Sequence, residues 1–477
     1  MDIMLHVMAP ELLLLATSMA LLVGDTFWAK RYPALTFQLA LVSLLAITGV
    51  IFTSFSTESV QLFNGAFIRD GVADVLKIAM LLMTVFAFVF AREYLVVRGI
   101  DRGEYYVMGM ISLLGMMVLA SAYDMLSLFM GLEVMSLALY AMIAMQKNSS
   151  TAIEAATKYF VLGAMATGLL LYGMSLIYGA VGSLRLDQIY QTISIAKPSL
   201  VLNMGLVFIV VGLAFKFGIA PFHMWVPDVY HGSPTGITLF LATAPKVAAF
   251  ALMFRLLIEG LESSIVEWQG LLIILAVLSL LVGNIVAIAQ TNLKRMLAYS
   301  AISHMGFVVL GFVVGNIEGY AAAMFYVIIY GLMSIGAFGV MLALSRKGFE
   351  ADNIADLAGL GRRNPLMALV MLVLLLSMAG VPPLVGFYAK LVILTNLVEV
   401  GMVSLAVFAV VMSIIGAFYY LRVIKTMYFD SSVVDMVDSG FATLSLRYGL
   451  MAIAALVLVL GILPNGLLAL FAHVMTY

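Results

Sequence analysis

Continuous apolar stretches, separated by short polar breaks, follow one another along the whole chain. A helix of roughly 18 residues or more, rising about 1.5 Å per residue, is long enough to cross a hydrocarbon core of about 30 Å. The pattern therefore predicts an all-α polytopic membrane protein with about fourteen transmembrane helices in a single membrane domain, residues 1–477. The expected spans are 5–24, 34–53, 73–91, 105–121, 125–145, 153–179, 201–226, 236–258, 269–289, 297–315, 319–345, 364–397, 402–428 and 446–472.

Composition agrees with a lipid bilayer as the surroundings. Hydrophobic residues make up 64% of the 477 residues and charged residues 10%, with a mean hydropathy of +1.14, which excludes a soluble domain. The net charge of −1 gives no basic surface for nucleic acid. Cysteine is absent and the five histidines show no metal-ligand spacing, so we expect no metal and no bound cofactor in this chain. Any redox chemistry would belong to partner subunits.

Lysine and arginine gather in alternate connections between the expected spans. Cytoplasmic loops carry the excess of these residues. The odd-numbered connections hold or border fifteen of them and the even-numbered ones three, which places both termini outside the cytoplasm. The first span contains Glu11 and has no basic segment before it, so we expect it to be retained rather than removed as a signal peptide. The fifteen are Lys30, Arg31, Arg92, Arg98, Arg102, Lys147, Lys294, Arg295, Arg346, Lys347, Arg362, Arg363, Arg422, Lys425 and Arg447, and the three are Arg69, Arg185 and Lys197.

Six further basic residues fall inside the expected spans. A lysine at the bilayer centre costs about 2.5–3.5 kcal/mol unless it is neutral, paired or hydrated, so such residues are usually functional. Lys77 and Arg255 lie near helix ends, where we expect their long side chains to reach the interface. The other four are Lys158, Lys216, Lys246 and Lys390.

Glu133, in the segment SLFMGLEVMSLALYAM, is an acidic residue at similar depth. A lone carboxylate in a hydrocarbon environment would take up a proton, whereas a carboxylate near a lysine can share charge with it. Lys216 and Lys246 each lie about ten residues from the nearest loop. A buried lysine with a switchable counter-ion could pass protons on, so we interpret these groups as elements of a proton relay.

The helix that carries Lys216 is interrupted directly after it. In FKFGIAPFHMWVP, glycine loosens the helix, and Pro221 and Pro227 each remove a backbone donor. Irregular backbone at membrane depth is tolerated where it is buried in protein or lines a wet cavity. We therefore expect Lys216 to lie beside water at a discontinuous helix.

A second interruption, SMAGVPPLVGFYAK, ends at Lys390. It lies 174 residues after Lys216, and His304 lies 171 residues after Glu133. Paired interrupted helices in two halves indicate an inverted repeat. We expect five-helix repeats at residues 105–260 and 265–428, preceded by a three-helix segment (1–104) and followed by a C-terminal helix (440–477). The spacing suggests a charge row through the membrane, made of Glu133, Lys216, Lys246, His304 and Lys390.

Several of these residues have a second interpretation. Lys158 is near the start of its helix and could be interfacial or the cytoplasmic proton input. His304 could be a relay or a hydrogen-bonded core histidine. His223 and Asp228 flank the first interruption and could be helix caps or part of an access path.

The chain resembles the antiporter-like membrane subunits of respiratory complex I. The similarity covers essentially the whole sequence and is carried by APFHMWVPDVYHGSPT with LATAPKVAAF after it, KYFVLGAMATG before it, and AGVPPLVGFYAK in the second half. The resemblance implies fourteen helices with two inverted five-helix repeats. The residues that match the family's charged positions are Glu133, Lys158, Lys216, Lys246 and Lys390, the last of which is glutamate in one related subunit.

The resemblance further implies a proton-translocating subunit of an NADH:quinone oxidoreductase in a bacterial inner membrane, with both termini on the periplasmic side. Quinone, NADH, FMN and iron–sulfur clusters would be bound by partner subunits, and sister antiporter-like subunits would be neighbours. Two alternatives stay open: a subunit of an Mrp-type cation/proton antiporter, which shares the fold and the lysines, and a scaffold whose charges are idle.

Overall fold

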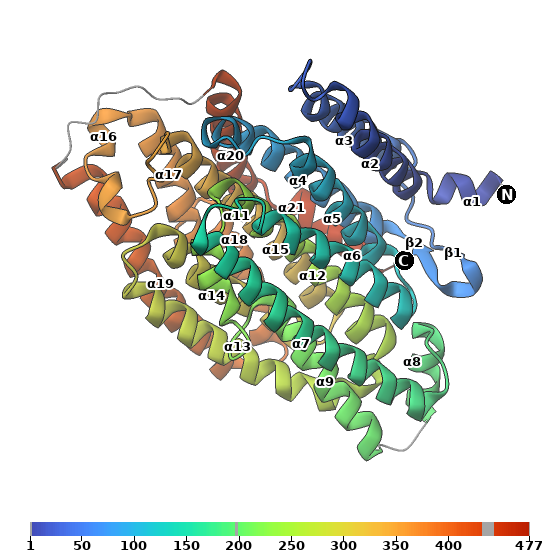
Figure 1. Ribbon diagram of the computed structural model, residues 1–477. Coiled ribbons are helices and arrows are strands. Elements are labelled where there is room, and N and C mark those ends of the chain that lie inside the picture. Colours follow the sequence, from blue (N-terminus) through green and yellow to red (C-terminus); the bar gives the residue numbers. More distant parts are fainter. Residues whose placement is uncertain (1, 196–198, 432–442, 477) are drawn as a thin grey trace.

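The computed structural model describes residues 2–195, 199–431 and 443–476, most of which are helical (Figure 1). Thirteen helical segments in these residues are long and apolar enough to cross a membrane, which confirms a polytopic helical protein. The N-terminal section consists of α1 (Asp2–Val7), α2 (Ala9–Trp28), α3 (Leu35–Thr53), β1 (Val60–Leu62), the 3₁₀ turn η1 (Phe63–Gly65), β2 (Phe67–Arg69) and α4 (Gly71–Arg98).

The small hairpin in this section was not predicted. Strands β1 and β2 pair antiparallel, with Val60 opposite Arg69, and a tight turn with Asn64 at φ 55° joins them. Three residues per strand are too few to show an alternating pattern in the sequence.

The middle of the chain contains the first interrupted helix. Its elements are α5 (Gly103–Ser121), α6 (Met125–Ile143), α7 (Ser150–Val181), α8 (Leu186–Ile195), α9 (Leu200–Phe217), α10 (Trp225–Gly232), α11 (Thr235–Leu241), α12 (Ala244–Met253), the π-helical turn η2 (Phe254–Gly260) and the 3₁₀ turn η3 (Glu262–Ser264). The expected span 201–226 is therefore shorter than predicted, since the regular helix ends at Phe217.

The last section contains the second interruption. Its elements are α13 (Ile265–Ile288), α14 (Leu293–Val314), α15 (Ile317–Leu344), η4 (Ile354–Leu357), α16 (Leu360–Arg363), α17 (Pro365–Ala379), α18 (Val385–Glu399), α19 (Val403–Phe429), α20 (Leu444–Ile462) and α21 (Asn465–Met475). The single span expected at 364–397 is two helices of 15 residues each, and the span expected at 446–472 is divided at Pro464.

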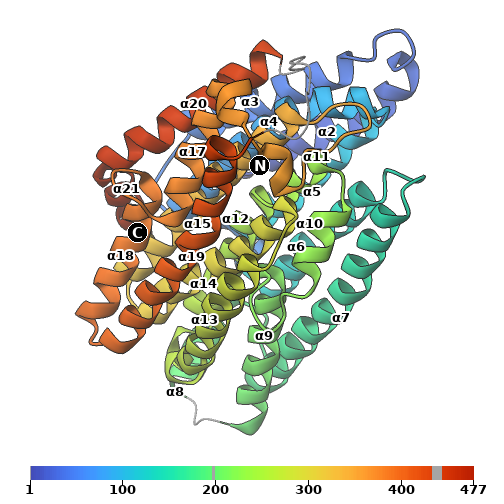
Figure 2. The same ribbon diagram turned by 90° about the vertical axis from the view of Figure 1, so that its left-hand side faces the viewer.

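The core lies around three segments. The buried share of the most apolar 18-residue stretch in each segment shows this. It is 100% in Thr235–Gly260, 94% in α14 and 83% in α15, but only 28% in each of α2, α3 and α20. Figure 2 shows α12, α14 and α15 in the middle of the bundle. Polar groups on these central helices are thus shielded from lipid by the outer helices.

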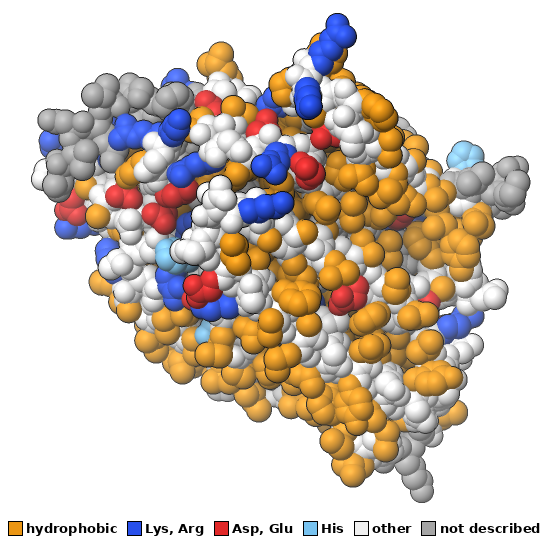
Figure 3. Space-filling view, viewed as in Figure 1, with side chains coloured by type: hydrophobic (Ala, Val, Ile, Leu, Met, Phe, Trp, Pro, Cys, Tyr) orange, Lys and Arg blue, Asp and Glu red, His pale blue; other side chains and the backbone are white. Residues whose placement is uncertain are grey.

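Charged side chains gather toward one end of the molecule. Figure 3 shows apolar side chains over most of the visible face, with Lys, Arg, Asp and Glu concentrated toward the end that carries α16 and the start of α17. Lys197, one of the three cations counted in the even-numbered connections, lies outside the described residues.

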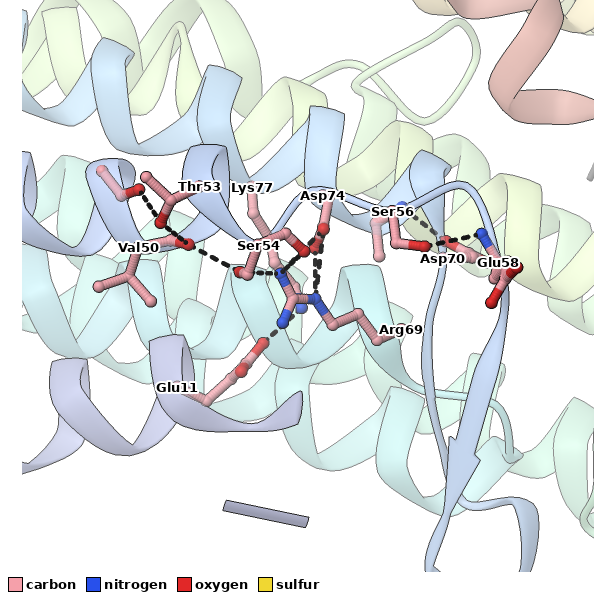
Figure 4. Close-up of polar contacts among 12 residues, drawn as sticks. Glu11, Val50, Thr53, Ser54, Ser56, Glu58, Arg69, Asp70, Asp74 and Lys77 are labelled. Carbon is pink, nitrogen blue, oxygen red and sulfur yellow. Dashed lines mark hydrogen bonds and ion pairs between the residues drawn. The ribbon is translucent and has the colours of Figure 1, made fainter. Parts of the chain in front are cut away.

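Lys77 was expected to reach the interface because it lies near a helix end, and this prediction is wrong. Its side chain is fully buried, and its Nζ lies 2.5 Å from Oε1 of Glu11 on α2, whose side chain is 5% exposed (Figure 4). Next to this pair, Arg69 forms a 3.0 Å ion pair with Asp74 and donates to Ser54 at the end of α3. All four charged groups are buried. Each cation has a carboxylate partner inside the protein, so its side chain does not need to extend to water at the membrane interface.

Arg255 is likewise buried rather than interfacial. Its guanidinium forms ion pairs with Asp70, at 2.7 Å, and with Glu259, and it donates to the carbonyl of Ala120 at the end of α5. Asp70 also caps α4 by accepting from Ala73 N. These contacts join α4, α5 and η2 through one cation.

We expect that replacing Glu11 by glutamine will destabilise the protein. It would leave the ammonium of Lys77 buried without a counter-ion, and breaking a buried pair costs about 3–5 kcal/mol. Thermal denaturation of the protein in its native membrane assembly would measure the loss.

The matched control replaces both members by methionine, which removes the charges together and should recover most of the stability. A Glu11→Gln protein as stable as the native one would show that the pair does not hold α2 against α4.

Candidate functional site

The first helix interruption is built by a glycine in the left-handed region. Gly218 has φ 71°, where a side chain would be strained, and a Cβ there would also meet Val226 Cγ2 at 2.5 Å. The amides of Gly218 and Ile219 turn back to the carbonyls of Phe215 and Ala214. The regular helix therefore stops with its last carbonyls directed into the protein core.

Side chains satisfy the carbonyls left at this end. The indole of Trp225 donates to Phe215 O at 3.0 Å, and Nζ of Lys246 donates to Phe217 O at 2.7 Å. Lys246 comes from α12, is 2% exposed, and lies 5.1 Å from the centroid of the Trp225 ring. Its ammonium is thus placed at the negative end of a helix dipole and over an aromatic face.

Lys216 occupies the last turn of α9 and bonds to α6. Its Nζ donates to Ser136 Oγ at 3.1 Å, and its residue is 8% exposed. Glu133 lies three residues before Ser136, so both point from the same side of α6. Within the described ranges, the Lys216 ammonium is bonded to this serine and no ion pair joins it to Glu133. The expected direct pair is therefore replaced by a serine contact.

The second interruption repeats this arrangement. α17 ends at Ala379, with Gly380 at φ 89°, and Nζ of Lys390 donates to the carbonyls of Met378 and Ala379, each at 3.0 Å. The same Nζ donates to Ser413 Oγ at 2.9 Å. In both interruptions, a buried lysine holds the exposed carbonyl end. The sequence spacing had paired Lys390 with Lys216. In its contact with the carbonyls at a helix end, however, Lys390 resembles Lys246.

His304 lies near the second interruption with both ring nitrogens bonded. Nδ1 is 2.8 Å from the hydroxyl of Tyr326 and Nε2 is 3.1 Å from that of Tyr420. A small cavity of about 10 Å³ is lined by His304 and Lys390 together with Tyr420. The histidine is therefore both a satisfied core residue and a neighbour of the lysine.

Lys158, Asp228 and Arg295 form an ion triad at the edge of the bundle. Nζ of Lys158 lies 2.8 Å from Oδ2 of Asp228 and 2.8 Å from Oε1 of Glu154, and Arg295 lies 2.9 Å from Oδ1 of Asp228. The Lys158 side chain is 42% exposed, so this lysine belongs to the surface edge rather than to the buried row. Asp228 connects α7 with the start of α14.

Burial by itself would raise the pKa of the Asp228 carboxyl. The hydrogen bonds from Lys158 and Arg295 outweigh that effect and hold its pKa below the usual value. His223 lies within the interruption, half-buried, with its ring 6.3 Å from that of Tyr299.

The sequence did not single out the neutral partners in this site. Ser136, Ser413, Tyr326 and Tyr420 each bond to a predicted residue, but serine and tyrosine are common in apolar helices and carry no motif. In the part of the chain that the structure describes, no group of three or more His, Asp or Glu side chains is placed to hold a metal.

Comparison with known proteins places the chain in a family. Residues 122–416 match the model of the NADH:quinone oxidoreductase/Mrp antiporter transmembrane family. NADH-quinone oxidoreductase subunit N of Thiobacillus denitrificans is 51% identical, with 96% of this chain and 95% of the relative covered. The subunit N of Hydrogenovibrio crunogenus is 48% identical over 97% of this chain and 96% of its own.

Solved structures agree with this assignment. A chain of respiratory complex I from Thermus thermophilus with bound aureothin superposes with a TM-score of 0.83 at 33% identity, covering 97% of this chain and 99% of that one. A chain of the Mrp complex from Dietzia has the same TM-score at 20% identity, with 99% and 96% covered, which shows a shared fold alone. With about half of its residues identical to subunit N proteins over nearly its full length, the chain belongs to the subunit N family of NADH-quinone oxidoreductases, within the antiporter-like membrane subunits.

Proposed function

We propose that this chain is a proton-translocating membrane subunit of a bacterial NADH:quinone oxidoreductase, and that protons cross it along the charge row. Family membership supports the first part. The observation that carries the second is the position of buried lysine ammonium groups on the freed carbonyls of two helix interruptions.

Each lysine couples a proton to the shape of an interruption. While Lys246 is charged, it satisfies Phe217 O and is held over Trp225. After it gives up a proton, the amine binds this carbonyl less strongly, and a buried acceptor left without a partner costs about 1–3 kcal/mol. Proton loss therefore favours a rearrangement of the backbone between α9 and α10, which is the coupling that a pump requires.

Glu133 and Lys216 act as the switch at the first interruption. Ser136 holds the lysine one turn along α6 from the carboxylate. A rotation of the flexible lysine side chain from Ser136 to Glu133 would close the pair without moving the helix. In the closed state Lys216 keeps its proton, and in the serine-bound state it can hand the proton toward Lys246.

We assign the architecture to two inverted five-helix repeats, residues 105–260 and 265–428. Counting α17 and α18 as one discontinuous helix raises the thirteen spans to fourteen. The two interruptions support the assignment, because each falls in the fourth expected span of its repeat and follows a glycine with positive φ, Gly218 and Gly380, and the family fold agrees. Residues 1–104 form the N-terminal segment, and the helix assigned to 440–477 includes residues 440–442 and 477, which lie outside the described residues.

The chain itself would bind no cofactor, and partner subunits would hold NADH, FMN, iron–sulfur clusters and quinone. Sister antiporter-like subunits and lipid would cover its apolar outer faces. The excess of Lys and Arg in the odd-numbered connections supports an inner-membrane orientation with both termini in the periplasm. Lys158 would then lie at the cytoplasmic edge, where the ion triad and His223 form the access path.

Replacing Lys216 by alanine should stop coupled proton transfer. We expect NADH-driven proton uptake in membrane vesicles and quinone-linked NADH oxidation to fall together by about tenfold or more, since this removes a proton-transfer group. Oxidation of NADH by an artificial acceptor and the amount of assembled complex should stay normal.

The control is Lys347→Ala, which removes an exposed lysine from the connection after α15. Normal pumping by the assembled Lys216→Ala complex would contradict the proposal and make the interrupted helix purely architectural.

The ion triad gives an expectation for pH. The pKa of Asp228 is lowered on folding, so the stability it adds is fully present above its unfolded value and is lost only as the pH falls through the lower folded value. We expect Asp228→Asn to lower stability by at most about 1 kcal/mol, because the side chain is a third exposed.

The loss should be the same at about pH 6 and about pH 8. Thermal denaturation of the variant and native complexes at the two pH values checks this. A loss that shrinks on going to pH 6 would mean that the carboxyl titrates near neutrality.

A further inference from the structure

Buried aromatic residues are part of both lysine sites. At the first, Tyr159 stacks on Trp225 with ring centroids 4.5 Å apart, and Nζ of Lys246 lies 5.1 Å from the centroid of the Trp225 ring. At the second, Tyr420 lines a cavity together with Lys390, and the ring of Tyr326 lies 5.8 Å from that of His304. Phenol groups are therefore present at each of the two lysine sites.

His304 is enclosed by two phenols, with Tyr326 on Nδ1 and Tyr420 on Nε2. A neutral imidazole donates through one nitrogen and accepts through the other. If Tyr326 donates to Nδ1, then Nε2 donates to Tyr420, and the opposite polarity is equally possible. The three groups thus form a short hydrogen-bond chain that can reverse as a unit.

Tyr420 joins this chain to Lys390. Its hydroxyl bonds to Ser300 Oγ as well as to His304, and it lines the cavity of about 10 Å³ that also touches Lys390 and Ser413. This volume is close to the smallest that holds one water, and the lining offers several polar partners. A single water would connect the hydroxyl of Tyr420 with the amine.

We propose that Tyr326 and Tyr420 are relay residues that, with His304 between them, carry protons from the first half of the chain to Lys390. The proposal rests on the proton-translocating function above and deepens it. It connects His304, a member of the charge row, to Lys390 through groups that transfer protons while staying neutral.

The transfer balances at every atom. When a proton from the first half of the chain is taken up by the Tyr326 oxygen, Tyr326 passes its own proton to Nδ1 of His304. The proton on Nε2 moves to the Tyr420 oxygen, and Tyr420 passes its own proton through the cavity water to the neutral amine of Lys390. Each tyrosine ends with one proton, His304 has changed tautomer, and Lys390 has become an ammonium. In this scheme Ser300 is the donor in its hydrogen bond to the Tyr420 oxygen and so positions Tyr420.

The test uses three isosteric substitutions in the assembled complex. Tyr326→Phe and Tyr420→Phe each remove a hydroxyl from the chain. Tyr330→Phe is the matched control, because it removes a buried hydroxyl one turn from Tyr326 on α15, beside the same histidine ring. Proton uptake, quinone-linked NADH oxidation, artificial-acceptor activity and the amount of assembled complex are measured in vesicles.

We expect proton uptake and quinone-linked turnover to fall about tenfold in the first two variants and to stay near normal in Tyr330→Phe. Ser300→Ala should cause a smaller fall that Ser300→Thr, which keeps a hydroxyl, restores. If Tyr420→Phe prevents assembly, Tyr326→Phe together with Ser300→Ala and Ser300→Thr still tests whether the tyrosines relay protons. Uptake in Tyr326→Phe equal to that in Tyr330→Phe overturns the proposal.

Lys390→Ala, measured in parallel, distinguishes failure of the tyrosine relay from failure of the whole charge row. Loss of pumping in Lys390→Ala with normal tyrosine variants refutes the tyrosine relay and leaves the charge row standing. Normal pumping in Lys390→Ala as well would overturn the charge row itself.

Discussion

The rest of this structure depends on how a membrane protein satisfies the backbone carbonyls of a broken helix. A carbonyl that lacks its helical partner within the bilayer finds no water from the lipid, so the protein must supply a donor. At both interruptions the donor is a buried lysine, Lys246 in the first and Lys390 in the second. The break and the charge therefore need each other, because the carbonyls stabilise a cation that hydrocarbon would exclude, and the cation permits the break.

Buried cations that contact α4 or its N-cap are satisfied in a different way. Lys77 with Glu11 and Arg255 with Asp70 are as deeply buried as Lys246 and Lys390, but each of these cations faces a carboxylate. A full ionic pair holds its proton firmly and suits fixed packing between helices. A carbonyl or a hydroxyl holds a lysine without neutralising it, which leaves the proton free to move. The type of partner thus separates structural charges from those suited to transport.

The sequence was sufficient for the parts of the fold that repeat a strong signal. Apolar runs located the spans, and glycine with proline located both interruptions to within a few residues. The depth of Lys216, Lys246 and Lys390 also singled them out. What it could not provide was the direction of side chains across the bundle. Lys77 and Arg255 looked interfacial because position along a helix says nothing of a carboxylate on another helix. The spacing in the sequence paired Lys390 with Lys216, whereas the carbonyl contacts of Lys390 resemble those of Lys246. Spacing could not show this, because the lysine that bonds to the freed carbonyls lies on a separate helix, α12, at the first interruption and on the second half of the broken helix, α18, at the second.

Neutral groups were the least visible from the sequence, yet in the structure they are direct hydrogen-bond partners of the predicted site residues. Ser136 holds Lys216, Ser413 holds Lys390, and Tyr326 and Tyr420 hold His304. A row made of charges alone would be difficult to operate in a low-dielectric core, since neighbouring cations repel and each empty position leaves a polar group unpaired. Hydroxyl groups can donate in one direction and then in the other at little cost. In the proposed relay, fixed hydroxyls between titrating lysines would allow charge to appear at one interruption at a time, and this separation would let the two halves of the chain change state in sequence.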